Sequence, residues 1–162
     1  MLRALTFDCW DTLYEGRAAE RVAGTGAVDD ALLMLPPAML PGAWPMLRTL
    51  ARRLTLAVVG DTGLASARAQ DRLLEKDAAR RLFAATIYLA GPARFAEALA
   101  RLDVPAGEII HVGDDERTDV RGALDAGFRA VRLDVVRSAG PSEAEFVARS
   151  FEELTRYVEG QL

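Results

Sequence analysis

Short apolar runs rich in β-branched residues alternate along this chain with segments of helical periodicity. The runs expected to form strands are Leu2–Cys9, Thr55–Val59, Ala84–Leu89, Glu108–Val112 and Arg129–Leu133. Strands that are apolar at nearly every position are typical of parallel sheets whose two faces are both covered by helices. The pattern therefore predicts a three-layer, Rossmann-like α/β fold, with a mostly parallel sheet and helices on both faces.

The segments between these strands carry apolar residues at the spacing of one helix face. Residues at i, i+3, i+4 and i+7 lie on the same side of a helix and can be buried together. The expected helices are Val28–Leu35, Trp44–Leu54, Leu64–Leu74, Phe95–Leu102, Val120–Leu124 and Phe151–Val158.

Length and charge narrow the class of protein further. The chain has 162 residues and a formal net charge of −4. We expect a single core domain over residues 1–162, in which the irregular segment 15–43 is a linker or a vestigial cap. The acidic balance argues against nucleic-acid binding, and no apolar run is long enough for a membrane span or a signal peptide. Cys9 is the only cysteine, so an internal disulfide is excluded and we expect a cytoplasmic protein.

Carboxylates follow three of the expected strands. In a parallel sheet, ligands bind beyond the carboxyl ends of the strands, where the winding direction switches. Carboxylates gathered there repel one another unless one is protonated or a cation lies between them, and oxygen ligands favour Mg²⁺. Each of these residues is also a common turn or capping residue when taken singly. They are Asp8 and Asp11, Asp61, and then Asp114, Asp115, Glu116 and Asp119.

Two of these stretches resemble motifs of the haloacid dehalogenase (HAD) superfamily. Residues 7–13 are similar to its first motif, in which a strand ends in a nucleophilic Asp and a Thr-Leu pair follows. Residues 112–123 are similar to its fourth motif, in which a strand leads into Gly-Asp and a further acid. Pro41-Gly42 with the strand that follows, and Pro92–Leu102, resemble the surroundings of the second and third motifs. The resemblance implies a HAD-like core without a separate cap domain.

The resemblance also implies roles for individual residues. Asp8 would be the nucleophile that forms an aspartyl-phosphate, and Asp11 is the candidate for general acid–base work. Mg²⁺ would be held by Asp8, the carbonyl oxygen of Trp10, Asp114 and Asp119. Thr62 and Arg94 are the candidates for phosphate binding, and Asp61 and Asp115 would lie around this site.

The chain departs from the family pattern at three positions. Trp10 stands where HAD phosphatases usually carry the acid–base Asp, which leaves Asp11 one residue late. Gly60 stands where Ser or Thr usually binds phosphate, and Gly91 replaces the usual Lys.

Other basic and nucleophilic residues offer few replacements. Lys76 is the only lysine and is expected to be a solvated charge at the opposite edge of the sheet. Arg94 is either a substitute for the missing Lys or an ordinary residue on a helix surface. His111 is expected to be a core residue, and Cys9 has no suitably placed His for a thiol mechanism.

Three functions remain open. The first is a capless, Mg²⁺-dependent phosphohydrolase whose phosphorylated substrate can be bulky, with the open site covered by substrate, a partner or a second copy in a homo-oligomer. The second is a catalytically silent relative that serves binding or structure. The third, a haloacid dehalogenase, still lacks the Lys and Ser that it would need. The retained Asp8, Asp114 and Asp119 favour the first, and the changes at Trp10, Gly60 and Gly91 favour the second.

Overall fold

A parallel sheet forms the centre of the molecule. The computed structural model describes residues 1–16, 28–136 and 140–162. The sheet has six strands in the order β3-β2-β1-β4-β5-β6, and every neighbouring pair is parallel. The strands are β1 (Ala4–Phe7), β2 (Thr55–Gly60), β3 (Ala85–Tyr88), β4 (Ile109–Gly113), β5 (Arg129–Leu133) and β6 (Phe146–Ala148). The predicted α/β class and parallel sheet are thereby confirmed.

The strand β6 was not predicted from the sequence. It is three residues long and pairs with β5 at one edge of the sheet. Its three residues are apolar, but a run this short does not distinguish a strand from a helix or a loop. Each of the five expected strands begins and ends within two residues of its predicted bounds.

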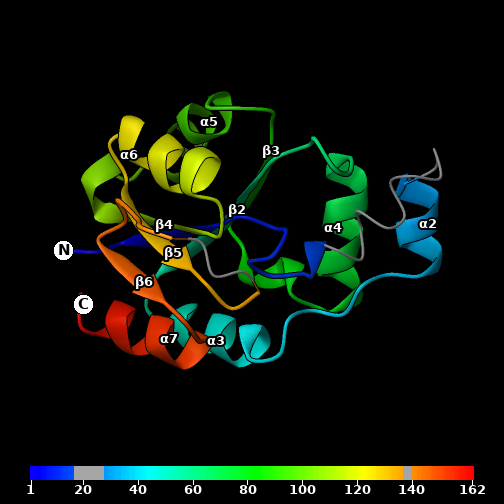
Figure 1. Ribbon diagram of the computed structural model, residues 1–162, viewed down its shortest axis with the longest axis horizontal. Coiled ribbons are helices and arrows are strands. Elements are labelled where there is room, and N and C mark those ends of the chain that lie inside the picture. Colours follow the sequence, from blue (N-terminus) through cyan, green and yellow to red (C-terminus); the bar gives the residue numbers. More distant parts are fainter. Residues whose placement is uncertain (17–27, 137–139) are drawn as a thin grey trace.

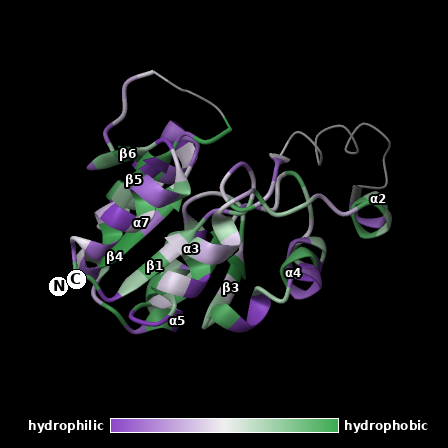
Figure 2. Ribbon diagram, turned by 90° about the horizontal axis from the view of Figure 1, so that it is seen from below, coloured by the Kyte–Doolittle hydropathy of each residue, from purple (hydrophilic) through white to green (hydrophobic). Residues whose placement is uncertain are grey.

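Helices cover both faces of the sheet, and Figure 1 shows α3 and α7 on one side and α5 and α6 on the other. The side chains of α3, α4 and α7 join one apolar core, and those of α5 and α6 join a second. Figure 2 shows that the strands are mostly hydrophobic and that the helices covering them carry both polar and apolar residues. The helices are α3 (Ala43–Leu50), α4 (Ala67–Lys76), α5 (Ala93–Leu102), α6 (Gly122–Asp125) and α7 (Phe151–Glu159).

Capping serines set where two of these helices begin. The Ser66 Oγ accepts the Ala69 N–H at 3.2 Å, so α4 begins three residues later than the periodicity suggested. The Ser150 Oγ accepts the Glu153 N–H at 3.1 Å and starts α7 in the same way. Both caps satisfy amides that have no partner within their own helix.

The segment 15–43 contains one described helix, α2 (Val28–Met34). It lies beside α4, where Leu32 is buried and the Asp29 Oδ1 accepts the Ser66 N–H at 3.1 Å. Residues 17–27 fall outside the described part, so the vestigial cap remains a prediction. Among the described residues, none of the helices has the length and apolar character needed to cross a membrane.

Candidate active site

The carboxyl ends of β1 and β4 bring Asp8 and Asp114 together. The two strands are neighbours, with Phe7 opposite Val112, and the Asp8 N–H donates to the Val112 oxygen at 2.9 Å. Carboxylate oxygens of Asp8, Asp114 and Asp119 all lie within 4.8 Å of one another. The convergence that the strand pattern predicted is therefore present in the fold, at the point where the strand order reverses.

A π-helical segment, Glu116–Arg121, carries Asp119 back toward the sheet. The Asp115 carboxylate caps this segment by accepting the N–H groups of Arg117 at 2.9 Å and Thr118 at 2.7 Å. The Asp119 Oδ2 in turn accepts the Asp115 N–H at 3.0 Å. A Cβ atom at Gly113 would overlap the Asp119 side chain, so only glycine allows this close approach.

Arg94 is buried at the centre of the acidic side chains and is only 1% exposed. One of its terminal nitrogens donates to the Asp119 Oδ1 at 2.7 Å and to the Thr118 carbonyl at 2.8 Å. The other lies 3.9 Å from a carboxylate oxygen of Asp8 and 3.9 Å from one of Asp61. The alternative of an ordinary helix-surface residue is therefore wrong, because the first turn of α5 points this side chain into the crevice.

His111 lies in β4 directly beneath Asp119. Its Nδ1 is 2.9 Å from the Thr6 hydroxyl, its Nε2 is 3.7 Å from the Asp119 Oδ1, and its ring packs edge-on against Phe95. Burial lowers the pKa of His111 below its ordinary value. The expectation of a core histidine is confirmed, but no pattern in the sequence indicated that this core position supports the acidic site.

The acidic residues influence one another's protonation. Burial, followed by the charge of Asp119, raises the pKa of Asp8 well above its ordinary value, although Arg94 acts in the opposite direction. Burial alone would also raise the pKa of Asp119, but the neighbouring His111 and Arg94 outweigh it, and the pKa is lowered. A site of this kind favours a proton or a cation beside Asp8.

The loop after β1 presents Trp10 and Asp11 to the same pocket. Asp11 is 3% exposed, adopts a left-handed backbone with φ 53°, and accepts the Gly16 N–H on Oδ1 at 2.7 Å. The Tyr14 hydroxyl fixes the end of this loop to α4, where it lies 2.9 Å from both the Leu73 oxygen and an Asp77 carboxylate oxygen. The loop is thus held by contacts at several points.

The end of β2 is tightly packed around Gly60, where the family pattern has a phosphate-binding Ser or Thr. A Cβ at Gly60 would lie 3.0 Å from the Gln70 Oε1 and 3.2 Å from the Tyr88 ring. Asp61 is turned onto backbone amides, and accepts the N–H groups of Gly63 at 2.6 Å and Gly91 at 3.2 Å. Among the described residues that line the pocket, Thr62 is absent, so the structure gives no support to its predicted phosphate contact.

The resulting pocket is open and acidic. Its volume of about 220 Å³ is below the roughly 300–1,000 Å³ of sites that enclose drug-sized ligands. All candidate metal ligands here are oxygen atoms, which fits a hard cation such as Mg²⁺. The lining carboxylates, which face the single guanidinium of Arg94, are Asp8, Asp11, Asp61, Asp114, Asp115 and Asp119.

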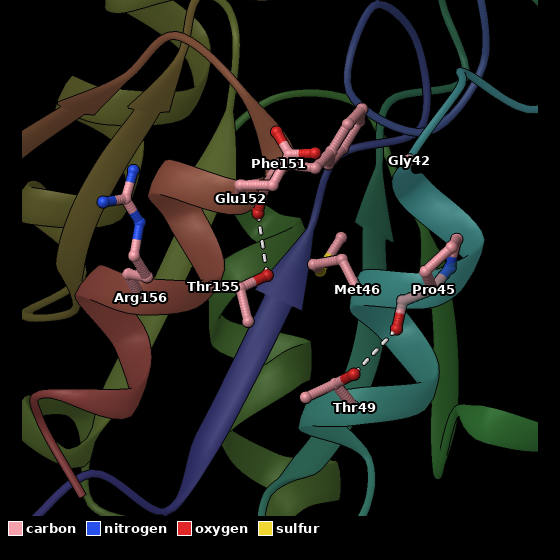
Figure 3. Close-up of a pocket in the computed structure, with 8 residues that line it drawn as sticks. All are labelled: Gly42, Pro45, Met46, Thr49, Phe151, Glu152, Thr155 and Arg156. Carbon is pink, nitrogen blue, oxygen red and sulfur yellow. Dashed lines mark hydrogen bonds between the residues drawn. The ribbon is translucent and has the colours of Figure 1, made fainter.

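A second hollow lies between α3 and α7 (Figure 3). Its floor is apolar and includes Met46 and Phe151. The Thr49 hydroxyl donates to the Pro45 oxygen at 3.0 Å and the Thr155 hydroxyl donates to the Phe151 oxygen at 2.7 Å, so both hydroxyls are engaged within their own helices. This hollow has none of the acidic cluster that the first pocket holds.

Comparison with known sequences agrees with this description. Residues 90–154 match a family model described as HAD-hydrolase-like. Over 33 residues the chain is 58% identical to 5-amino-6-(5-phospho-D-ribitylamino)uracil phosphatase YigB of Escherichia coli. That match spans 20% of this chain and 14% of the length of the relative.

Solved structures share the whole fold at low sequence identity. A HAD phosphatase from Thermococcus onnurineus has a TM-score of 0.83 at 19% identity, and the match covers 98% of this chain and 99% of that one. The magnesium-bound HAD-hydrolase YfnB of Bacillus subtilis has a TM-score of 0.80 at 16% identity, covering 97% and 98%. A 2-haloacid dehalogenase from Pseudomonas syringae has a TM-score of 0.79 at 20% identity, and both chains are fully covered. Residues 90–154 thus match the HAD-hydrolase-like family model, and the whole chain has the fold of the solved structures that are described as HAD hydrolases and phosphatases.

Proposed function

We propose that this protein is a Mg²⁺-dependent phosphohydrolase that uses Asp8 as its nucleophile. The observation that carries the proposal is the convergence of Asp8, Asp114 and Asp119 at the strand ends, with a buried Arg94 among them. Two of the similar proteins are described as phosphatases, and a third is described as magnesium-bound. These descriptions agree with the chemistry that the residues of this chain support.

Each residue has a defined task under this proposal. Asp8, Asp114 and Asp119 would hold Mg²⁺, together with the carbonyl oxygen of Trp10. The ion would lower the repulsion between Asp8 and a phosphate dianion and would stabilise charge during transfer. Arg94 holds the Asp119 carboxylate in place at 2.7 Å and supplies a fixed positive charge that the Gly91 loop lacks.

The small size of the pocket bears on the substrate. A volume of about 220 Å³ accommodates the reacting group, while the remainder of a larger substrate would lie outside the crevice. Water would then be excluded by the substrate itself, by a partner or by a second copy of the chain. A bulky phosphorylated substrate fits this arrangement, and a homo-oligomer that covers the crevice is the alternative.

The direct test compares wild type with Asp8→Asn in the hydrolysis of p-nitrophenyl phosphate and acetyl phosphate, with Mg²⁺ and with EDTA. Asp125→Asn, an exposed acid on α6, is the matched control for loss of one carboxylate. We expect turnover that requires both Mg²⁺ and Asp8 and that survives in the Asp125 variant. Full turnover in Asp8→Asn would exclude Asp8 as the nucleophile.

A silent, binding relative is the second candidate, and the crowded position at Gly60 favours it. If the scaffold binds Mg²⁺ but catalysis has been lost, calorimetry would show Mg²⁺ binding that depends on Asp114, with no hydrolysis above the Asp8→Asn background. Dehalogenation is tested separately, through halide release from 2-haloacids in metal-free buffer. The absence of halide would remove that third option.

A further inference from the structure

Apart from its carboxyl groups, the acidic pocket is lined by no described side chain that gives up a proton to a leaving group. The Arg94 guanidinium does not release its proton in proteins, and the Trp10 indole only donates a hydrogen bond. The Thr118 hydroxyl donates to the Asp115 carboxylate at 3.1 Å. His111 is the only histidine of the chain and lies beneath Asp119, in the sheet.

The carboxylates of the pocket are already engaged in other tasks. Asp8, Asp114 and Asp119 form the cluster assigned to the nucleophile and the metal. The remaining three accept backbone amides: Asp61 from Gly63 and Gly91, Asp115 from Arg117 and Thr118, and Asp11 from Gly16. Asp11 is the candidate acid nearest to Asp8 in sequence, and its carboxylate lies against Gly16, where an added Cβ would be only 3.1 Å away.

A site without a proton donor for the leaving group does not favour all phosphorylated substrates equally. An alkyl phosphate expels an alkoxide, which departs slowly unless a general acid protonates it, and such help is worth about 10²–10⁴-fold. An acyl phosphate expels a carboxylate, which is stable without a proton. We propose that this site takes its phosphoryl group from acyl phosphates, that is, mixed anhydrides of a carboxylic acid and phosphoric acid. This inference rests on the proposed phosphohydrolase function of Asp8.

Both chemical steps then proceed without an acid from the protein. In the first, an Asp8 oxygen attacks phosphorus, the anhydride P–O bond breaks, and its electron pair leaves on the departing carboxylate. In the second, water attacks phosphorus, the P–O bond to Asp8 breaks, and Asp8 is restored as a carboxylate. The two protons of the water remain on the product, dihydrogen phosphate. The leaving group is a carboxylate each time, which is why one site serves both steps.

The test measures kcat/KM with Mg²⁺ for acetyl phosphate, for substituted phenyl phosphates of graded phenol pKa, and for glycerol phosphate. We expect kcat/KM to fall steeply as the pKa of the leaving group rises, with glycerol phosphate at least about 10²-fold below acetyl phosphate. Trp10→Asp, which places a carboxylic acid beside Asp8, should raise the alkyl rate more than the acyl rate and flatten this dependence.

Asp11→Asn tests whether Asp11 protonates the leaving group. If Asp11 is not the donor, this variant changes the acyl and alkyl rates by the same factor. A selective loss of glycerol phosphate turnover in Asp11→Asn, or a flat dependence in the wild type, would overturn the inference while leaving the phosphohydrolase function intact. No turnover of any donor, acetyl phosphate included, would overturn both.

Discussion

Arg94 shows how a single side chain can define a site although the sequence leaves its role open. It is one of many arginines on helices, and helical spacing alone does not distinguish a side chain that faces solvent from one at a helix start that faces a crevice. The structure places its guanidinium between Asp119 and Asp8. When one partner of a buried ion pair is removed, the charge that remains has no counter-charge.

We predict that Arg94→Met destabilises the protein by about 3–5 kcal/mol in metal-free buffer, because buried carboxylates lose their counter-charge. Arg101→Met is the control, since that exposed α5 arginine forms an i,i+4 surface pair with Glu97. It should cost no more than about 0.5 kcal/mol. Urea denaturation measures both. Equal effects of the two substitutions would contradict the central position of Arg94.

Gly113 gives a second residue-scale prediction. Gly113→Ala places a methyl group where the Asp119 side chain now lies, so Asp119 must move away from Asp8 and Asp114. We expect a loss of about 1–3 kcal/mol in stability and at least a tenfold weaker binding of Mg²⁺ by calorimetry. Gly107→Ala is the matched control, because a Cβ at that position meets no atom within 4 Å. Unchanged Mg²⁺ binding in Gly113→Ala would show that Asp119 is not a ligand.

At the scale of elements, the regular strands were predictable and the connections were not. Each long strand is a local apolar run, so its residues reveal it without knowledge of the rest of the fold. The strand β6 and the π-helical segment Glu116–Arg121 depend instead on contacts made by distant residues. Arg132 of β5 is 2% exposed and joins Glu116, Asp134 and the Gly140 carbonyl, three groups that lie apart in the sequence.

This network gives a pH-dependent prediction at Glu116. Burial alone would raise its pKa, but the Glu143 N–H, the Ser142 hydroxyl and Arg132 outweigh it and lower the pKa below 4.5. The stabilisation is therefore present above pH 4.5 and is lost as the pH falls through the lower, folded-state pKa.

We expect Glu116→Gln to lower the free energy of unfolding by about 1 kcal/mol at pH 7, after allowance for solvent screening. The gap to the wild type should narrow as the pH falls below 4.5. The experiment is urea denaturation across pH 3–7, with Glu159→Gln, an exposed acid at the end of α7, as control. A gap that widens toward acid would contradict the sign of this pKa shift.

At the scale of the whole molecule, the sheet brings together residues that lie more than a hundred positions apart. The sequence predicted that Asp8 and Asp114 meet, because the carboxyl ends of neighbouring parallel strands share one edge. It could not predict how their surroundings are filled. Gln70 and Tyr88 lie close to Gly60, and Asp61 is held by the Gly91 amide, while phosphate binding by Thr62 stays a prediction.

Binding of Mg²⁺ should stabilise the entire fold, since the folded state alone assembles the carboxylates. We expect the free energy of unfolding to rise by about 2.7 kcal/mol when the ion is present at a hundred times its Kd. Asp114→Asn should lose this gain, because one of the carboxylates that would hold the ion is removed. Thermal unfolding with Mg²⁺ and with EDTA measures both. If Mg²⁺ still stabilises Asp114→Asn, the ion binds at a site that does not include Asp114.

The left-handed backbone of Gly91, at φ 66°, limits the residues that this position can hold without strain. Any residue with a Cβ bears a conformational penalty there, so a lysine at position 91 would cost stability. Arg94 makes no such demand, because its side chain enters the crevice from the first turn of α5. The positive charge of this site is thus carried by a regular helix and not by the loop before it.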